Sequence, residues 1–124
     1  MYEFIKYQGL GNDFLILEGR FDPRFSNKSF PTKNFITRIC HRNFGLGADG
    51  LIIILPPSDG GYVQMRICNA DGTEAEMCGN GIRCLVKYLL DKNEVNLDQE
   101  IEIDTLAGKI KAKGISNSDI QVDM

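Results

Sequence analysis

Cys78-Gly79-Asn80-Gly81 opens the most helix-like segment of the chain, residues 82–90. Only Arg83 and Lys87 interrupt the apolar residues of this segment. A helix that is apolar on most of its sides has to be surrounded by other elements rather than laid on a surface. The rest of the chain is therefore expected to fold around this helix.

The start of such a helix is also a candidate site. Its first backbone N–H groups lack partners within the helix and carry a partial positive charge. Cys78 can be held there as a thiolate, because both features stabilise the anion. Gly79 and Gly81 disfavour a helix start, but they leave room for a ligand to approach the backbone. The residues alone leave two interpretations open: Cys78 is a catalytic base or nucleophile, or it is structural.

Composition limits the class of protein. The 124 residues are enough for one domain with one core. Apolar residues make up 43% and charged residues 25%, as in ordinary globular proteins. A net charge of −3 without a basic run gives no reason to expect nucleic acid as a partner. No apolar run approaches the roughly 20 residues that span a membrane. No signal peptide is visible, so a cytoplasmic location with reduced thiols is expected.

The expected cytoplasmic setting disfavours disulfides, and the spacing of the cysteines disfavours zinc. The four cysteines contain no CxxC pair, and the single histidine, His41, directly follows Cys40. Neighbouring residues in an extended chain point apart and seldom share a metal ion. No metal site is predicted. Cys84 lies among leucines, and we expect it, with Cys40 and Cys68, to be a buried apolar residue.

Alternation and turn residues predict the other elements. A short amphipathic helix is expected at 34–40, with Thr32 as its cap. A turn at 9–13 would join the first two strands into a hairpin whose tip carries Asn12, and polar residues 19–33 would form a loop. A second turn is expected at Ala107-Gly108. The expected strands are 3–7, 14–17, 51–55, 62–68, 100–105, 110–113 and 120–124. The predicted fold class is α+β, with a largely antiparallel or mixed sheet against or around one central helix.

Gly45-x-Gly47-x-x-Gly50 matches the dinucleotide-binding fingerprint letter for letter. That fingerprint has to follow a strand and open a helix. Here the glycines follow a helical segment and precede a strand. A turn in which backbone segments approach closely is therefore the favoured interpretation.

Several polar residues near turns have two interpretations. Asn12 and Asn69 either adopt turn conformations or bind a ligand, and Asp49 and Asp71 share this ambiguity. The residues themselves do not decide between the two roles.

Five stretches together resemble the diaminopimelate epimerase family, the cofactor-independent isomerases of the lysine pathway. The order and spacing of the five match, and the likeness covers essentially the whole chain. The stretches are Lys6-Tyr-Gln-Gly-Leu-Gly-Asn-Asp-Phe14, Arg42-Asn-Phe-Gly-Leu-Gly-Ala-Asp-Gly50, Cys68-Asn-Ala-Asp-Gly-Thr-Glu74, Met77-Cys-Gly-Asn-Gly-Ile-Arg-Cys84 and Thr105-Leu-Ala-Gly108.

The resemblance implies a fold of two similar halves, each a sheet curled round a central helix, with the active site in the cleft between them. Residues 1–124 would be a single domain, the N-terminal half of this pseudo-symmetric fold. The C-terminal half, which carries a second catalytic cysteine, would be absent. The chain stops at Met124 inside an expected strand, which agrees with this interpretation.

The resemblance also implies roles for individual residues. Cys78 would be one of two acid/base thiols, and Asn12 and Asn69 would bind the substrate, diaminopimelate. Gly79 and Asn80 would offer donors to its reacting centre. No sequence signal calls for pyridoxal phosphate, a metal ion or nicotinamide.

The sequence departs from the family pattern at one position and is compatible with other classes of protein. Some family members carry a substrate-binding Gln where this chain has Gly50. A related isomerase, similar to proline racemases or phenazine-pathway proteins, is an alternative enzyme. A non-catalytic half-domain that binds an amino acid or a partner surface is the alternative from another class. The oligomeric state is left open, a homodimer included.

Overall fold

A computed structural model describes residues 4–9, 11–22, 31–43 and 45–123. Parts of the expected first and last strands, of the hairpin turn at 9–13 and of the loop at 19–33 lie outside these residues. The helices are α1 (Lys33–Cys40) and α2 (Gly79–Asp91). The strands are β1 (Phe4–Gly9), β2 (Asn12–Glu18), β3 (Gly50–Leu55), β4 (Val63–Asn69), β5 (Glu74–Ala75), β6 (Ile101–Thr105), β7 (Gly108–Gly114) and β8 (Ile120–Asp123).

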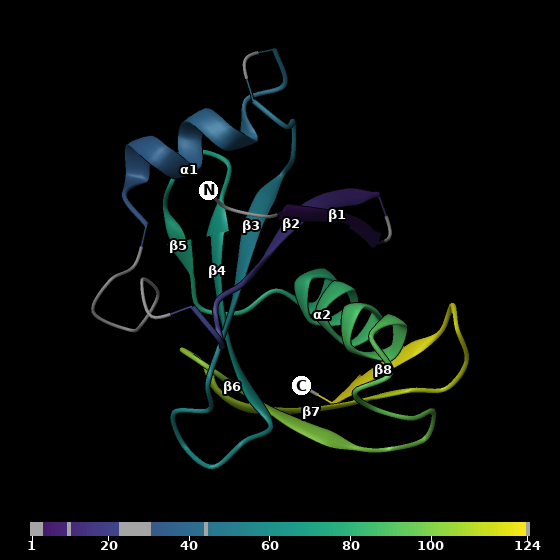
Figure 1. Ribbon diagram of the computed structural model, residues 1–124. Coiled ribbons are helices and arrows are strands. Elements are labelled where there is room, and N and C mark those ends of the chain that lie inside the picture. Colours follow the sequence, from purple (N-terminus) through teal and green to yellow (C-terminus); the bar gives the residue numbers. More distant parts are fainter. Residues whose placement is uncertain (1–3, 10, 23–30, 44, 124) are drawn as a thin grey trace.

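The strands form one sheet in the order β1-β2-β3-β4-β6-β7-β8. β2 with β3 and β4 with β6 are parallel pairs, and the other pairs of described strands are antiparallel. β5 and β6 share one edge of β4, because β5 pairs with the end of β4 and β6 with its beginning. The chain leaves β5, runs through α2 and returns as β6. Figure 1 shows the sheet curled around α2, with α1 outside the curl.

β3 is apolar throughout because both of its faces are covered. All six of its residues are buried. Ile52 and Ile54 belong to the core on the α2 side, whereas Leu51, Ile53 and Leu55 belong to the core on the α1 side. The short apolar run seen in the sequence is therefore the wall between two cores.

Helix α2 is enclosed, as its composition predicts. Its apolar residues pack against strands from both ends of the sheet, β1 and β2 on one side and β7 and β8 on the other. Helix α1 covers the opposite face through the buried Ile36 and Cys40. Thr32 Oγ1 accepts a hydrogen bond from the N–H of Phe35 at 3.2 Å, which confirms the predicted cap.

An ion-pair network fixes the far end of α2 to the sheet. Arg20, whose side chain is only 9% exposed, donates to Glu18 and Glu94 at 2.6–2.8 Å. Tyr88 on α2 donates to Glu18 at 3.0 Å, and Tyr62 donates to Glu94 at 3.1 Å. The network joins β2, α2 and the loop that follows α2.

The predicted fold class is confirmed, but one short strand is missing from the prediction and two turn residues are placed wrongly. The segment before Cys78 contains the two-residue strand β5, which is too short to show alternation. Asn12 pairs with Gly9, so it begins β2 rather than forming the tip of the hairpin. Gly108 pairs with Thr105, so it begins β7 rather than forming the turn.

Candidate active site

Cys78 lies directly before α2 in an extended conformation, with φ −146° and ψ 120°. Its carbonyl accepts the first helical hydrogen bond, from the N–H of Ile82 at 2.9 Å. Its side chain makes no capping hydrogen bond. The thiol is half-buried. The helix start therefore leaves both the thiol and the early backbone N–H groups available for chemistry.

The other three cysteines are buried, as the sequence predicts. Burial raises the pKa of Cys84 to about 11 and the pKa of Cys68 to about 12. Burial also raises the pKa of Cys40. Cys78 is thus the accessible thiol among the four.

Gly81 has a packing role. A Cβ atom at this position would lie 2.7 Å from Ile67 Cδ1 on β4. The glycine lets the first turn of α2 lie against the sheet. Close packing, rather than room for a ligand, explains why glycine suits this position.

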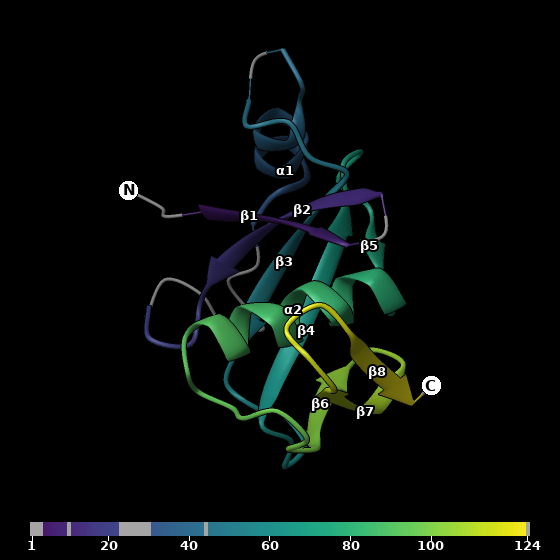
Figure 2. The same cartoon turned by 90° about the vertical axis from the view of Figure 1, so that its right-hand side faces the viewer.

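A row of side-chain hydrogen bonds joins α2 to the starts of β2 and β3. Asn80 Nδ2 donates to Asn12 Oδ1 at 2.7 Å, and Asn12 Nδ2 donates to Asp49 Oδ2 at 3.5 Å. Arg83 Nη1 donates to Asn80 Oδ1 at 3.2 Å. We call these four residues, Arg83, Asn80, Asn12 and Asp49, the amide row. The hairpin of β1 and β2 lies beside the start of α2 in Figure 2, and this arrangement brings Asn12 within hydrogen-bonding distance of Asn80.

Asp49 anchors the outer end of the amide row. It accepts from the N–H of Asp13 at 2.8 Å and from Arg42 Nη2 at 3.0 Å. The backbone N–H of Asp13, the amide of Asn12 and the charge of Arg42 hold the pKa of Asp49 below its usual value, in that order. Arg42 also pairs with Asp13 at 3.3 Å.

Asn69 lies next to the amide row but is not part of it. It ends β4 opposite Gly50, and the following N–H, from Ala70, donates to the carbonyl of Asp49 at 3.0 Å. Its side chain is exposed and donates to Thr73 within its own turn at 3.1 Å. The structure therefore brings Asn12 and Asn80 into contact and places Asn69 nearby.

Asp71 is a turn residue. It accepts from both the hydroxyl and the N–H of Thr73, at 2.6 and 2.9 Å, and these bonds lower its pKa. Such a bond pattern is typical of the Asp that fixes a turn.

Gly50 has no space for a side chain. A Cβ atom there would lie 2.6 Å from the carbonyl oxygen of Cys68 and 3.2 Å from the ring of Phe14. Gly45 is similar, because a Cβ atom there would overlap the backbone of α1. The glycines around Asp49 shape a close approach of backbone segments and lead into a strand, as the sequence predicts.

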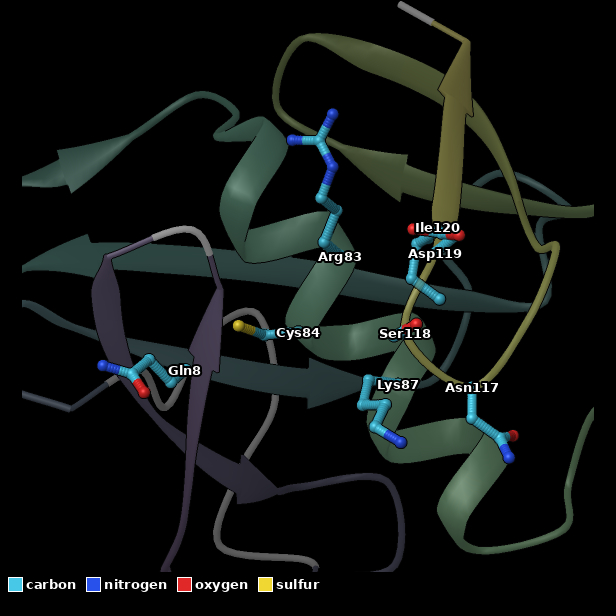
Figure 3. Close-up of a pocket in the computed structure, with 8 residues that line it drawn as sticks. All are labelled: Gln8, Arg83, Cys84, Lys87, Asn117, Ser118, Asp119 and Ile120. Atoms are coloured by element: carbon cyan, nitrogen blue, oxygen red, sulfur yellow. The ribbon is translucent and has the colours of Figure 1, made fainter.

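A cavity of about 570 Å³ runs along α2 between β1 and β8. Figure 3 shows Cys84 and Gln8 on one side of it and Asn117 on the other. Cys78 does not line this cavity. The candidate site is instead the start of α2 with Cys78 and the amide row, of which only Arg83 also lines the cavity.

Two properties of the described residues bear on cofactors and membranes. Within residues 4–9, 11–22, 31–43 and 45–123, no three His, Cys, Asp or Glu side chains are grouped to hold a metal ion. Neither α1 nor α2 has the length and apolar content needed to cross a membrane.

Asp49, Arg42 and Arg83 were not singled out as site residues by the sequence. Asp49 was one of several ambiguous turn residues, and Arg83 was only an interruption of an apolar helix. Arg42 and Asp49 lie within one of the five stretches of resemblance, and Arg83 lies within another. The bond of Asp49 to Asn12 joins positions 37 apart in the chain, whereas Arg83 and Asn80 are three positions apart on α2.

Solved racemases and epimerases share the fold of this chain. A probable proline racemase from Agrobacterium radiobacter K84 superposes with a TM-score of 0.73 at 14% identity, covering 100% of this chain and 42% of that chain. A hydroxyproline epimerase from Agrobacterium vitis superposes with a TM-score of 0.72 at 14% identity, covering 99% and 41%. This likeness establishes the fold, and the coverage fits one half of a two-domain molecule.

The sequence comparison identifies the family. The family model of diaminopimelate epimerase matches residues 4–124. The diaminopimelate epimerase of Prochlorococcus marinus strain NATL1A is 51% identical over 124 residues, which cover 98% of this chain and 43% of the relative. The chain belongs to the diaminopimelate epimerase family, which confirms the resemblance drawn from the five stretches. It spans less than half the length of the curated relatives that it matches.

Proposed function

We propose that this chain supplies one half of an enzyme that converts LL-2,6-diaminopimelate to the meso form without a cofactor. Family membership supports the reaction, which serves the biosynthesis of lysine and of peptidoglycan precursors. The observation that carries the proposal is the half-buried Cys78 directly before α2, the helix whose Asn80 donates a hydrogen bond to Asn12.

The chemistry requires two groups on opposite faces of the substrate. Inverting an α-carbon means removing a weakly acidic proton from one face and returning a proton to the other. A single group cannot do both unless the substrate turns over. In the proposed mechanism a thiolate takes the α-proton and a second thiol donates its own proton to the opposite face. Cys78 is one of this pair.

The helix start suits the charge that develops in this reaction. Removal of the α-proton pushes negative charge onto the α-carboxylate. In the proposal the backbone N–H groups of Gly79 and Asn80 stabilise that charge, because they point out of a positively polarised helix end. The side chains of Asn12, Asn80 and Asn69 hold the substrate by hydrogen bonds. A closed cleft that excludes water would strengthen these interactions.

The second thiol comes from a part of the protein that this chain does not contain. The coverage of 43% of the Prochlorococcus relative supports this division. We propose that the C-terminal half is the partner of this chain and that the isolated chain does not epimerise diaminopimelate. The reaction is assigned to the cytoplasm, where thiols stay reduced. A homodimer of the completed enzyme is compatible with the proposal but not required by it.

The experiment joins this chain to the C-terminal part of the Prochlorococcus marinus NATL1A relative, beginning where the match ends. The joined protein and the isolated chain are each incubated with LL-diaminopimelate, and the product is resolved on a chiral column. Formation of the meso isomer by the joined protein alone is the expected result. Conversion by the isolated chain at a comparable rate would overturn the two-half mechanism.

A further inference from the structure

We propose that Arg83 and Asp49 are positioning residues that fix the direction in which the amide side chains of Asn80 and Asn12 lie. The inference rests on the proposed function, because these two amides are proposed substrate ligands. An amide group has two ends of nearly equal shape, one donating and one accepting, so its direction has to be set by its neighbours.

The inner end of the amide row is a group that only donates. A guanidinium has five N–H donors and no acceptor. Arg83 Nη1 lies 3.2 Å from Asn80, so the atom of Asn80 that faces it has to be Oδ1. The amino group of Asn80 is thereby turned to Asn12, where it donates at 2.7 Å.

The outer end of the row is a group that only accepts. An ionised carboxylate has acceptors but no donor. Asp49 faces Asn12 at 3.5 Å, so the atom of Asn12 nearest to it has to be Nδ2. Asp49 is itself held by the N–H of Asp13 and by Arg42. Oδ1 of Asn12 is then left to accept from Asn80.

Arg83 and Asp49, at the two ends of the amide row, require the same orientation of the amides of Asn80 and Asn12. Reversing either amide would set two donors together at Arg83 or two acceptors together at Asp49. Figure 3 shows Arg83 extending along α2 in the direction opposite to Lys87, which lies one turn further on. With the direction fixed, each amide keeps one N–H and one lone pair for a bound amino acid. Both amides are half-buried, which keeps their geometry sensitive to the groups at the two ends.

The direct test measures the amides in this chain, without any catalysis. The exchange rates of the Nδ2 protons of Asn80 and Asn12 are followed by ¹⁵N-edited NMR in the parent chain and in variants. Arg83→Gln replaces a group that only donates, and Asp49→Asn replaces a group that only accepts. In each variant the new amide can both donate and accept. Exchange at Nδ2 is expected to be about two- to tenfold faster in both variants, the change for one hydrogen bond lost.

Two variants make the test specific. Arg83→Lys keeps a donor-only group and is expected to retain slow exchange. Lys87→Gln removes the same charge from the next turn of α2 and is expected to leave the rates at parent values. Far-UV circular dichroism checks that each variant folds. If Arg83→Gln does not fold, Asp49→Asn still tests the inference from the Asp49 end of the amide row. Unchanged exchange in Arg83→Gln and Asp49→Asn would overturn the inference.

A second readout uses the joined protein. In Arg83→Gln, KM for LL-diaminopimelate is expected to rise and kcat/KM to fall about 10- to 100-fold, as for misplaced ligand groups. Arg83→Lys should recover much of the loss, and Lys87→Gln should match the parent. A merely structural role would lower the folded fraction and leave KM unchanged, which would contradict the inference. If the parent joined protein does not epimerise, the proposed function fails, and the exchange rates still decide the direction of the amides.

Discussion

Asn80 and Asn12 are 68 positions apart in the sequence, and their side chains share a hydrogen bond of 2.7 Å. The bond joins the first turn of α2 to the beginning of β2. It therefore places two proposed substrate ligands on two rigid elements rather than on loops. Cys78 precedes the same turn, so the thiol and the amide of Asn80 are held by one helix.

Asn12→Asp should destabilise the chain by about 1–2 kcal/mol at neutral pH. The substitution sets a carboxylate against Asp49, which lies 3.5 Å from the present amide nitrogen. Urea unfolding followed by circular dichroism measures the loss. The loss should shrink at acidic pH, because protonation of either carboxyl group removes the repulsion.

The matched control is Asn69→Asp. The side chain of Asn69 is exposed, and among the described residues it bonds only to Thr73 in its own turn, so the same chemical change should alter stability by less than about 0.5 kcal/mol. Equal losses in the two variants would show that the environment of Asn12 has no special sensitivity to charge.

Cys78 should be alkylated first among the four cysteines. It is half-buried, whereas Cys40, Cys68 and Cys84 are buried with raised pKa values. Brief treatment with iodoacetamide, followed by digestion and mass spectrometry, gives the order of reaction. Cys78→Ser should leave a chain that reacts slowly at every remaining thiol. Uniform reactivity of the four thiols would favour the alternative of a non-catalytic half-domain.

Much of the fold could be predicted because its strongest signals are local. The apolar segment at 82–90 predicts a buried helix, and the alternation in β4 and β6 predicts strands and the residues that they bury. β5 escaped prediction because two residues cannot show a period, and its pairing with β4 is a tertiary effect. The strand β3 was placed correctly, but its two-sided burial required α1 and α2 to be present together.

From the residues alone, a candidate site residue could be singled out only where its own side chain is reactive. Cys78 could be singled out as a thiol at a helix start. Asp49 and Arg83 could not, because their roles consist of bonds to Asn12 and Asn80. The partner of Asp49 lies 37 positions away, which the sequence does not indicate. The i,i+3 spacing of Asn80 and Arg83 on a helix allows a contact but does not show which end of the amide faces Arg83. Gly50 is a departure from the family pattern, and the carbonyl of Cys68 and the ring of Phe14, which only the fold brings there, explain why the position is closed to a side chain.

Arg20→Gln should weaken the dependence of stability on acid. Hydrogen bonds from Arg20 lower the pKa of Glu94 below its ordinary value of 4.5. A group with a lowered folded-state pKa adds stability above about pH 4.5, and that stability is lost as the pH falls through the folded pKa. Urea midpoints between pH 7 and pH 3 should therefore fall less steeply in Arg20→Gln than in the parent.

The same variant should lose about 1–3 kcal/mol at pH 7, because charged hydrogen bonds of a nearly buried guanidinium are removed. Lys87→Gln is the control, since its pair with Asp91 is exposed and weak. An acid profile that is parallel in Arg20→Gln and the parent would contradict the role assigned to the network.

Gly50→Ala should destabilise the chain by about 1–3 kcal/mol, and Gly50→Gln by at least as much. The added Cβ atom meets the backbone carbonyl of Cys68, which cannot rotate away as a side-chain end would. Thermal unfolding measures both variants. A parent-like melting temperature in Gly50→Gln would mean that the strand pair of β3 and β4 accepts the residue found in other family members.

The most direct test of the central claim follows the α-proton in the joined protein. LL-Diaminopimelate is incubated in D₂O with the parent, with Cys78→Ala and with Cys84→Ala, which removes a buried thiol from the same helix. Deuterium at the inverted α-carbon is measured by mass spectrometry together with meso product. We predict deuterated meso product from the parent and from Cys84→Ala, and a loss of at least about 100-fold in Cys78→Ala. Parent-like conversion in Cys78→Ala would contradict the assignment of Cys78 as an acid/base thiol.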